Sequence, residues 1–245
     1  MKSINICFSP ALYPYYSQND DKTLVVVVDV FRASTTICAA FAAGAVAVCP
    51  VKSLNEAVQA KARGSLVAAE RNADKCDFAD FGNSPFDYTP EKLYGKTLFF
   101  TSTNGTSAIE TVNNSNSAEI IIGAFVNLQA VADFCIERGK NILILCAGWK
   151  NRFSIEDTLF GGALIEILIA SGYFTANSDS AYVSQILWKQ AKDNIFNFLK
   201  DTEHFSRLKN RVLDNDIHFC LQKNTINLLP IFNKSKNLIE LCSVG

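Results

Sequence analysis

Charged side chains stand directly after several apolar, strand-like segments of this 245-residue chain. Asp29 follows the β-branched run Val25–Val28, and Arg32 comes shortly after it. An apolar run without alternation is typical of a strand that is buried on both faces in a parallel sheet. Ligands of open α/β sheets bind beyond the carboxyl ends of such strands, so we expect Asp29 and Arg32 at a ligand site. In the alternative interpretation, Asp29 caps a helix and Arg32 pairs with it on the surface.

Other strand ends supply compatible side chains. Oxygen ligands without His or Cys suit a hard cation such as Mg²⁺, which binds through one or two carboxylates and keeps water molecules. Arginine presents a fork of N–H donors that suits phosphate, carboxylate or sulfonate, and helix N-termini add free N–H groups. The sequence therefore predicts metal-assisted chemistry on a small, multiply anionic molecule. The pooled residues are the carboxylates Asp29, Glu70, Glu156 and Asp157, the cations Arg32, Arg71, Lys150 and Arg152, and the small or hydroxyl residues Ser34, Thr35, Ser84, Thr101, Ser102, Thr103, Gly105 and Gly148.

Several familiar arrangements are absent from the sequence. It contains neither the G-x-x-x-x-G-K-[ST] pattern of a P-loop nor the G-x-G-x-x-G pattern of a dinucleotide fold. Phosphatases of the haloacid dehalogenase type also have an Asp at a strand end, but Phe31 stands where they need a second Asp. His204 and His218 lie far along the chain from the candidate loops. We therefore interpret each histidine as a surface or helix-packing residue rather than as a general base.

The eight cysteines form no C-x-x-C pair and have no nearby His to complete a zinc site. Most lie in apolar surroundings, which indicates reduced, buried thiols in a reducing compartment. Cys146 differs because it ends a strand-like run at a candidate loop, and a catalytic thiol there is an alternative.

The bulk properties narrow the class of protein. With 49% hydrophobic and 19% charged residues, the composition is typical of a globular domain. The net charge of −1 favours neither nucleic acid nor a membrane surface as a partner, and no apolar run is long enough to span a bilayer. We expect a single domain over residues 1–245 in the cytoplasm. The sequence leaves open whether the protein forms a homodimer.

Strand-like and helix-like segments alternate through most of the chain, which favours a mostly parallel sheet covered by helices on both faces. We predict an α/β fold of the three-layer α/β/α type, in which the sheet is mostly parallel or mixed and the C-terminal part is mainly helical. If the strands before the candidate loops are parallel neighbours, those loops meet at one edge. The predicted strands are Ser3–Ser9 (near an edge), Val25–Val28, Ala45–Val51, Leu66–Ala69, Lys96–Phe100, Ala118–Gly123, Asn141–Cys146 and Asn227–Phe232. The predicted helices are Ile37–Ala43, a helix capped by Ser53 that runs to Arg63, Ser107–Val112, Asn127–Arg138, Ser154–Gly172, Asn177–Leu199, Thr202–Val212 and Asn215–Lys223.

Five short motifs, in order along the chain, resemble the 2-phosphosulfolactate phosphatase (ComB-like) family. They are Val28-Asp29-Val30-Phe31-Arg32-Ala33-Ser34-Thr35-Thr36, Glu70-Arg71, Phe81-Gly82-Asn83-Ser84-Pro85, Thr101-Ser102-Thr103-Asn104-Gly105-Thr106, and Cys146-Ala147-Gly148-Trp149 followed by Glu156-Asp157-Thr158. The family pattern has glycines after Glu-Arg, whereas this chain has Asn72 and Ala73.

The resemblance implies an α/β/α fold and a Mg²⁺-dependent acid phosphatase. The family's named reaction converts (2R)-2-phospho-3-sulfolactate and water into 3-sulfolactate and phosphate, a step in coenzyme M biosynthesis. On this basis we expect Asp29, Arg32, Glu70 and Glu156 to be catalytic. We expect Mg²⁺ to be held by Asp29 with Glu156 or Asp157. Substrate binding is assigned to Ser34, Thr35, Arg71, Asn83, Ser84, Thr101, Thr103, Asn104, Gly105, Gly148 and Arg152.

Two alternatives remain at this stage. The chain could be a phosphatase for another small phosphorylated hydroxy acid, or a non-catalytic binder of anionic metabolites. Within the phosphatase hypothesis, Glu70 or another acid could activate the attacking water, or Asp29 could form an aspartyl-phosphate intermediate.

Overall fold

The apolar run that ends before Asp29 forms β2 (Thr23–Val28), an interior strand of the sheet. A computed structural model describes residues 1–16, 22–114, 118–209 and 214–242. Val26 and Val28 belong to one hydrophobic core, and Val25 and Val27 to a second core on the other face. Because both faces of β2 are covered, every position of the strand after Thr23 is apolar and buried, as the unbroken run predicts.

The described strands form one 11-stranded sheet. Its order is β5-β4-β6-β3-β11-β10-β7-β2-β8-β1-β9. Up to β8 the predicted strands agree closely with the observed ones, except that the short β5 was not predicted. β1 lies one strand from an edge, as expected. The strands are β1 (Lys2–Cys7), β2, β3 (Ala47–Pro50), β4 (Leu66–Arg71), β5 (Asp74–Lys75), β6 (Thr97–Thr101), β7 (Glu119–Gly123), β8 (Asn141–Cys146), β9 (Phe174–Thr175), β10 (Pro230–Asn233) and β11 (Leu238–Leu241).

The sheet contains two parallel groups of strands that are separated by an antiparallel hairpin. β7, β2, β8, β1 and β9 are parallel to one another, as are β4, β6 and β3. β10 and β11 lie between the groups and pair antiparallel with each other and with their outer neighbours. Because three successive pairings between β7 and β3 are antiparallel, the two groups of strands run in opposite directions. The sheet is therefore mixed, which agrees with the predicted fold class.

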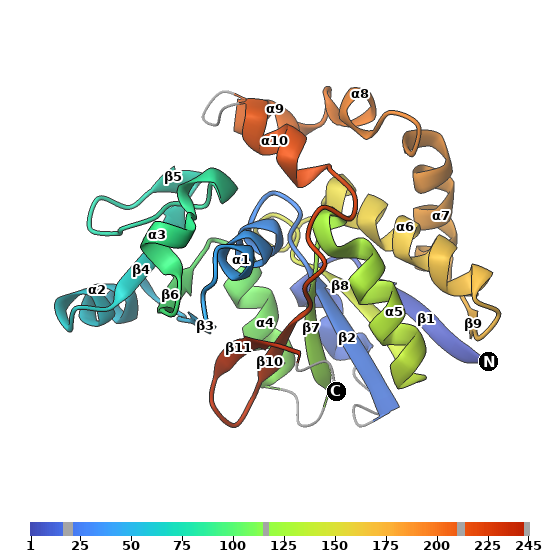
Figure 1. The fold of residues 1–245 in the computed structure, drawn as a ribbon. Coiled ribbons are helices and arrows are strands. Elements are labelled where there is room, and N and C mark those ends of the chain that lie inside the picture. Colours follow the sequence, from blue (N-terminus) through green and yellow to red (C-terminus); the bar gives the residue numbers. More distant parts are fainter. Residues whose placement is uncertain (17–21, 115–117, 210–213, 243–245) are drawn as a thin grey trace.

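Helices cover both faces of the sheet (Figure 1). On one face of the sheet, α5, α6 and α7 pack against β7, β8 and β1. On the opposite face, α1 and α4 pack against the sheet. This arrangement gives the three layers that the sequence predicts. The helices are α1 (Ala33–Ala42), α2 (Leu54–Ala62), α3 (Pro90–Leu93), α4 (Gly105–Asn113), α5 (Leu128–Arg138), α6 (Ile155–Ala170), α7 (Asp179–Ala191), α8 (Ile195–Leu199), α9 (Glu203–Lys209) and α10 (Asp214–Cys220), with short 3-10 turns at Pro10–Tyr15, Pro85–Asp87 and Phe125–Asn127.

The C-terminal part departs from the prediction in two places. The single predicted helix Asn177–Leu199 is wrong, because the helix ends after α7 and Asn194 starts α8 by accepting a hydrogen bond from the Asn197 N–H at 2.9 Å. The predicted closing strand Asn227–Phe232 is also corrected: the chain forms the hairpin β10–β11 inside the sheet. The last residues of the predicted helix Thr202–Val212 lie outside the described residues.

The helices α8, α9 and α10 lie over the end of the sheet where β2 and β8 finish (Figure 1). This placement brings residues from the last quarter of the chain next to the motif-bearing loops. In the described part of the chain, no helix is both long and apolar enough to cross a bilayer.

Candidate active site

Asp29 stands at the carboxyl end of β2 and is buried, with 6% of its surface exposed. Its backbone N–H donates to Ser34 Oγ at 2.9 Å, and its Oδ1 accepts from the Ala33 N–H at 3.4 Å. The Thr35 hydroxyl donates back to the Val30 carbonyl at 3.0 Å. The hydroxyl groups predicted to bind substrate at positions 34 and 35 therefore take part in holding the shape of this loop.

Asp157 connects the loop after β2 to the loop after β8. It lies in the first turn of α6, where the Ser154 side chain caps the helix by accepting from the Asp157 N–H at 3.3 Å. Its Oδ1 accepts from the Val30 N–H at 2.8 Å, and its Oδ2 accepts from the Gly148 N–H at 3.1 Å. One carboxylate thus fixes two adjacent parallel strand ends, and the structure brings these two predicted loops together.

The N-terminus of α4 approaches the same place. A Cβ atom at Gly105 would lie 2.5 Å from the Ala33 Cβ and 3.0 Å from Asp29 Oδ2, so only glycine fits there. The Asn104 side chain accepts from the Lys150 N–H at 3.0 Å, which ties this loop to the loop after β8. The loops after β2, β6 and β8 therefore meet.

This meeting does not come from the arrangement that we predicted. β2 and β8 are parallel neighbours, but β6 is separated from β2 by β3, β11, β10 and β7, and belongs to the group that runs in the opposite sense. Neighbouring strands are rotated by roughly 20–25° on average. Because this twist accumulates over five steps, the sheet can coil far enough for the ends of β2 and β6 to approach each other. The assumption that all these strands are parallel neighbours is therefore wrong for β6.

Glu70 and Arg71 organise the loops around β4 and β6. Glu70 Oε1 accepts from the Ala73 N–H and from the Thr103 hydroxyl (3.1 Å), and Oε2 accepts from the Thr103 N–H (3.3 Å). Arg71 donates to Thr101 Oγ1 at 3.0 Å. Asn72 and Ala73 both adopt left-handed backbone conformations (φ 54° and 74°), which glycine adopts without strain.

His204 on α9 lies in this site, so the prediction that neither histidine is near the candidate loops is wrong for His204. Its Nδ1 is in close contact with Glu156 Oε1, and its ring packs against Phe31 and Trp149 with centroid distances of 5.8 and 5.7 Å. No spacing in the sequence indicates this contact, because the two residues are 48 positions apart. His218 is exposed and stacks on Phe196, which agrees with a packing role.

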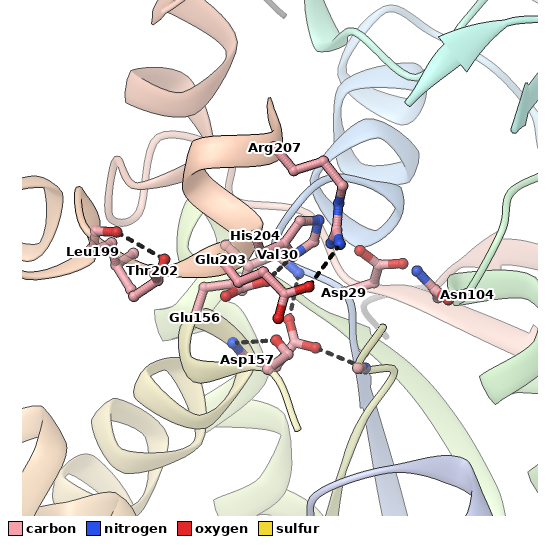
Figure 2. Close-up of polar contacts among 12 residues, drawn as sticks. Asp29, Val30, Asn104, Glu156, Asp157, Leu199, Thr202, Glu203, His204 and Arg207 are labelled. Carbon is pink, nitrogen blue, oxygen red and sulfur yellow. Dashed lines mark hydrogen bonds and ion pairs between the residues drawn. The ribbon is translucent and has the colours of Figure 1, made fainter. Parts of the chain in front are cut away.

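Burial and neighbouring charges shift the pKa values of three carboxylates here, those of Asp29, Glu156 and Asp157. The pKa of Asp29 is raised to about 7, because burial and the charges of Glu70 and Glu156, which raise it, outweigh the charge of His204 and the hydrogen bond from the Ala33 N–H, which lower it. Burial, followed by the charges of Glu156 and Asp29, raises the pKa of Asp157 well above its usual value. Burial also opposes ionisation of Glu156, but the charge and hydrogen bond of His204 lower its pKa. Figure 2 shows the side chains of Asp29, Glu156 and Asp157 gathered beside His204 of α9.

The residues present fit a hard divalent cation. Glu156 Oε2 is buried and has no hydrogen-bond partner among the described atoms, and the surrounding carboxylates repel one another. Within the described ranges, no group of three or more His, Cys, Asp or Glu side chains is arranged to share one ion. Mg²⁺ needs only one or two carboxylates, because water and substrate oxygens complete its shell. Burial raises the pKa of the Cys146 thiol well above its usual value, which disfavours the alternative of a catalytic thiolate.

Asp29, Glu70, Glu156 and Asp157 together are called the carboxylate cluster below. Arg32 does not point into this cluster. Its side chain is 5% exposed and forms an ion pair of 2.6 Å with Asp216 on α10, and it also donates to the Ala73 carbonyl at 3.2 Å. The Ser84 hydroxyl donates to the same carboxylate at 2.8 Å. Asn83 lies alongside, where its carbonyl accepts from the Thr36 hydroxyl and its side-chain Oδ1 is buried without a partner among the described atoms. These residues anchor α10 to two of the motif loops.

A cavity of about 240 Å³ opens beside the carboxylate cluster, between the loop after β8 and α9. Glu156 and His204 contribute to its wall, together with Arg152, Arg207 and Trp149. Arg152, predicted to bind substrate, is therefore placed at this cavity rather than within the cluster.

Comparison with known proteins gives a consistent result. The family model described as 2-phosphosulpholactate phosphatase matches residues 7–235. A protein of Thermotoga maritima named probable 2-phosphosulfolactate phosphatase is 38% identical over 205 residues, which cover 84% of this chain and 87% of that protein. A protein with the same name from Caldanaerobacter subterraneus subsp. tengcongensis is 35% identical, over 89% of this chain and 92% of that protein. Another from Microcystis aeruginosa is 31% identical, over 96% of this chain and 98% of that protein.

Proposed function

Because this chain belongs to the 2-phosphosulfolactate phosphatase family, we propose that it hydrolyses (2R)-2-phospho-3-sulfolactate to 3-sulfolactate and phosphate. The observation that carries the proposal is the gathering of four buried carboxylates from three different strand ends: Asp29, Glu70, Glu156 and Asp157. They lie close enough that the charges of Glu70 and Glu156 raise the pKa of Asp29, and those of Glu156 and Asp29 raise the pKa of Asp157. A place in coenzyme M biosynthesis in the cytoplasm belongs to the same proposal.

We propose that Mg²⁺ is the cofactor and that Asp29, with Glu156 or Asp157, would hold it. The unpartnered Glu156 Oε2 and the repulsion among the buried carboxylates support this choice. When bound, the ion would compensate the negative charge of the phosphoryl oxygens.

The protein's own residues would position the phosphoryl group. The close approach of Gly105 to Asp29 places the N-terminus of α4 beside the carboxylates, where its backbone N–H groups favour an anion. Arg71 and the loop that begins at Thr101 are tied to this terminus through Glu70 and Thr103. Such fixed donors stabilise charge on a transferring phosphoryl group without having to reorganise.

In the direct mechanism, a water oxygen attacks phosphorus, the bond from phosphorus to the ester oxygen breaks, and the leaving oxygen takes up a proton. In the competing mechanism, Asp29 attacks first and forms an aspartyl phosphate that water then hydrolyses. Rapid quenching with ³²P-labelled substrate distinguishes them, because only the second leaves label on Asp29.

The proposal is tested by measuring phosphate release from 2-phospho-3-sulfolactate with Mg²⁺ and with a chelator. We expect release that the chelator abolishes and that the Asp29→Asn variant loses almost completely. A panel of phosphorylated hydroxy acids without sulfonate decides whether another substrate is preferred. Binding of the substrate without any phosphate release would instead support a non-catalytic binder.

A further inference from the structure

The cavity beside the carboxylate cluster carries cationic side chains on its outer side. Arg152 comes from the loop after β8, and Arg207 comes from α9. On its inner side lie Glu156 and His204, which are in contact with each other. A small molecule whose phosphate reached the carboxylate cluster would therefore direct its other end toward these two arginines.

Arg207 is held in a defined orientation. The carbon of its guanidinium group lies 3.6 Å from the centroid of the Trp149 ring, and its side chain is 22% exposed. A guanidinium group stacked on an aromatic face keeps its N–H donors directed outward in the plane of the group. Figure 2 shows this side chain extending from α9 toward Asp29. Trp149 itself is fixed, because its backbone forms paired hydrogen bonds with Arg152.

Two carboxylates face the same cavity and could oppose an incoming anion. Glu156 already contacts His204, which offsets its charge. Glu203 lies 3.7 Å from Arg207, but its side chain is 79% exposed. Exposed ion pairs of this length contribute little, so an anionic ligand with better geometry can replace this contact.

We propose that Arg207, together with Arg152, binds the second oxyanion of the substrate, either its sulfonate or its carboxylate. The inference rests on the proposed phosphatase activity. It assigns selectivity for multiply anionic phosphate esters to α9, which lies outside the motifs that identify the family. Arg207 is a specificity-determining residue in this scheme and is not required for cleavage of the phosphate ester itself.

The test compares three substrates: 2-phospho-3-sulfolactate, 2-phospholactate (carboxylate only) and an aryl phosphate (neither group). In the Arg207→Gln variant we expect KM for 2-phospho-3-sulfolactate to rise about 10- to 100-fold, as for the loss of a charge-assisted hydrogen bond. KM for the aryl phosphate should stay within about twofold of wild type. An increase for 2-phospholactate as well would identify the carboxylate as the bound group, and no increase would identify the sulfonate.

The matched control is Lys209→Gln, which removes the same charge from an exposed position of the same helix. It should leave all three KM values unchanged. Arg207→Lys keeps the charge but not the planar fork, so it should restore part of the affinity. If Arg207→Gln leaves KM for 2-phospho-3-sulfolactate unchanged, or changes all three substrates equally, the inference is wrong. If the wild type releases phosphate from none of them, the proposed function fails instead.

Discussion

Arg32 and Asp216 form a buried ion pair of 2.6 Å across 184 positions of the chain. It joins the loop after β2 to α10, and the Ser84 hydroxyl ties a second loop to the same carboxylate. An arginine that looks like a phosphate ligand in the sequence therefore anchors the C-terminal helices over the site.

Removing one partner of this pair should be costly. Asp216→Ala leaves the guanidinium group of Arg32 buried without its counter-charge, and we expect a loss of about 3–5 kcal/mol in the free energy of unfolding. Urea denaturation measures it. Lys236→Ala, which breaks an exposed ion pair with Glu240, is the control and should cost about 1 kcal/mol or less. Equal effects for the two variants would show that the Arg32–Asp216 pair does not anchor α10.

Gly105 should tolerate no side chain. Gly105→Ala places a methyl group 2.5 Å from the Ala33 Cβ and 3.0 Å from Asp29 Oδ2, so the two loops must move apart. We expect a loss of about 1–3 kcal/mol in stability, as for other overpacked sites, and a marked fall in kcat. Ser107→Ala, at an exposed position of α4, should change neither quantity. If Gly105→Ala keeps the wild-type kcat, the close packing of Gly105 against Ala33 and Asp29 is not needed for activity.

The contact between His204 and Glu156 should matter for turnover. His204→Asn removes the ring that offsets the charge of Glu156 beside Asp29, and we expect kcat to fall by roughly 100-fold or more, as when a positioned imidazole is lost. His218→Asn is the matched control, since His218 is exposed and stacks on Phe196. Steady-state kinetics on the same substrate compare the two. A comparable loss in both variants would contradict the assignment.

Mg²⁺ should stabilise the protein even without substrate. The charge of Glu156 raises the pKa of both Asp29 and Asp157, so a bound cation relieves the repulsion among these carboxylates. At a free concentration of 100 times its Kd, a ligand adds about 2.7 kcal/mol, which a thermal melt detects. In Asp29→Asn the Mg²⁺-dependent shift should be smaller, because one candidate ligand is gone. An unchanged melting temperature in the wild type at millimolar Mg²⁺ would count against the proposed cofactor.

Asp80, which does not belong to the carboxylate cluster, should make stability depend on pH. Burial alone would raise the pKa of Asp80, but the contact with Lys61 and the hydrogen bond from the Val67 N–H at 2.9 Å lower it below 3.8. Because the folded state holds this proton less tightly than the unfolded state, Asp80 stabilises the fold at neutral pH and loses that effect as the pH falls below about 3.8.

The Asp80→Asn variant tests this dependence by urea denaturation between pH 3 and 7. We expect it to be about 1 kcal/mol less stable than wild type at pH 7, and the difference to shrink toward pH 3. Asp201→Asn, at an exposed position, should show no such trend. A difference that is constant over the whole range would contradict the assignment.

The sequence alone predicted most strands and helices as far as β8, and the candidate residues that stand at the strand ends. The unbroken valines of β2, the cap at Ser53 and the acidic first turn of α6 are local patterns, because burial on two faces and helix capping each require particular residue types nearby. The same local information predicts the fold class. It also places four carboxylates at or after strand ends: Asp29, Glu70, Glu156 and Asp157.

Only the tertiary structure decided which of these residues meet. The hairpin β10–β11 separates two parallel groups, and yet Gly105 after β6 lies against Asp29 after β2. The pairing of His204 with Glu156, and of Arg32 with Asp216, depends on how α9 and α10 fold back over the sheet. Contacts between such distant segments leave no periodic signal in the chain, because the charges that attract each other need to be adjacent only in space.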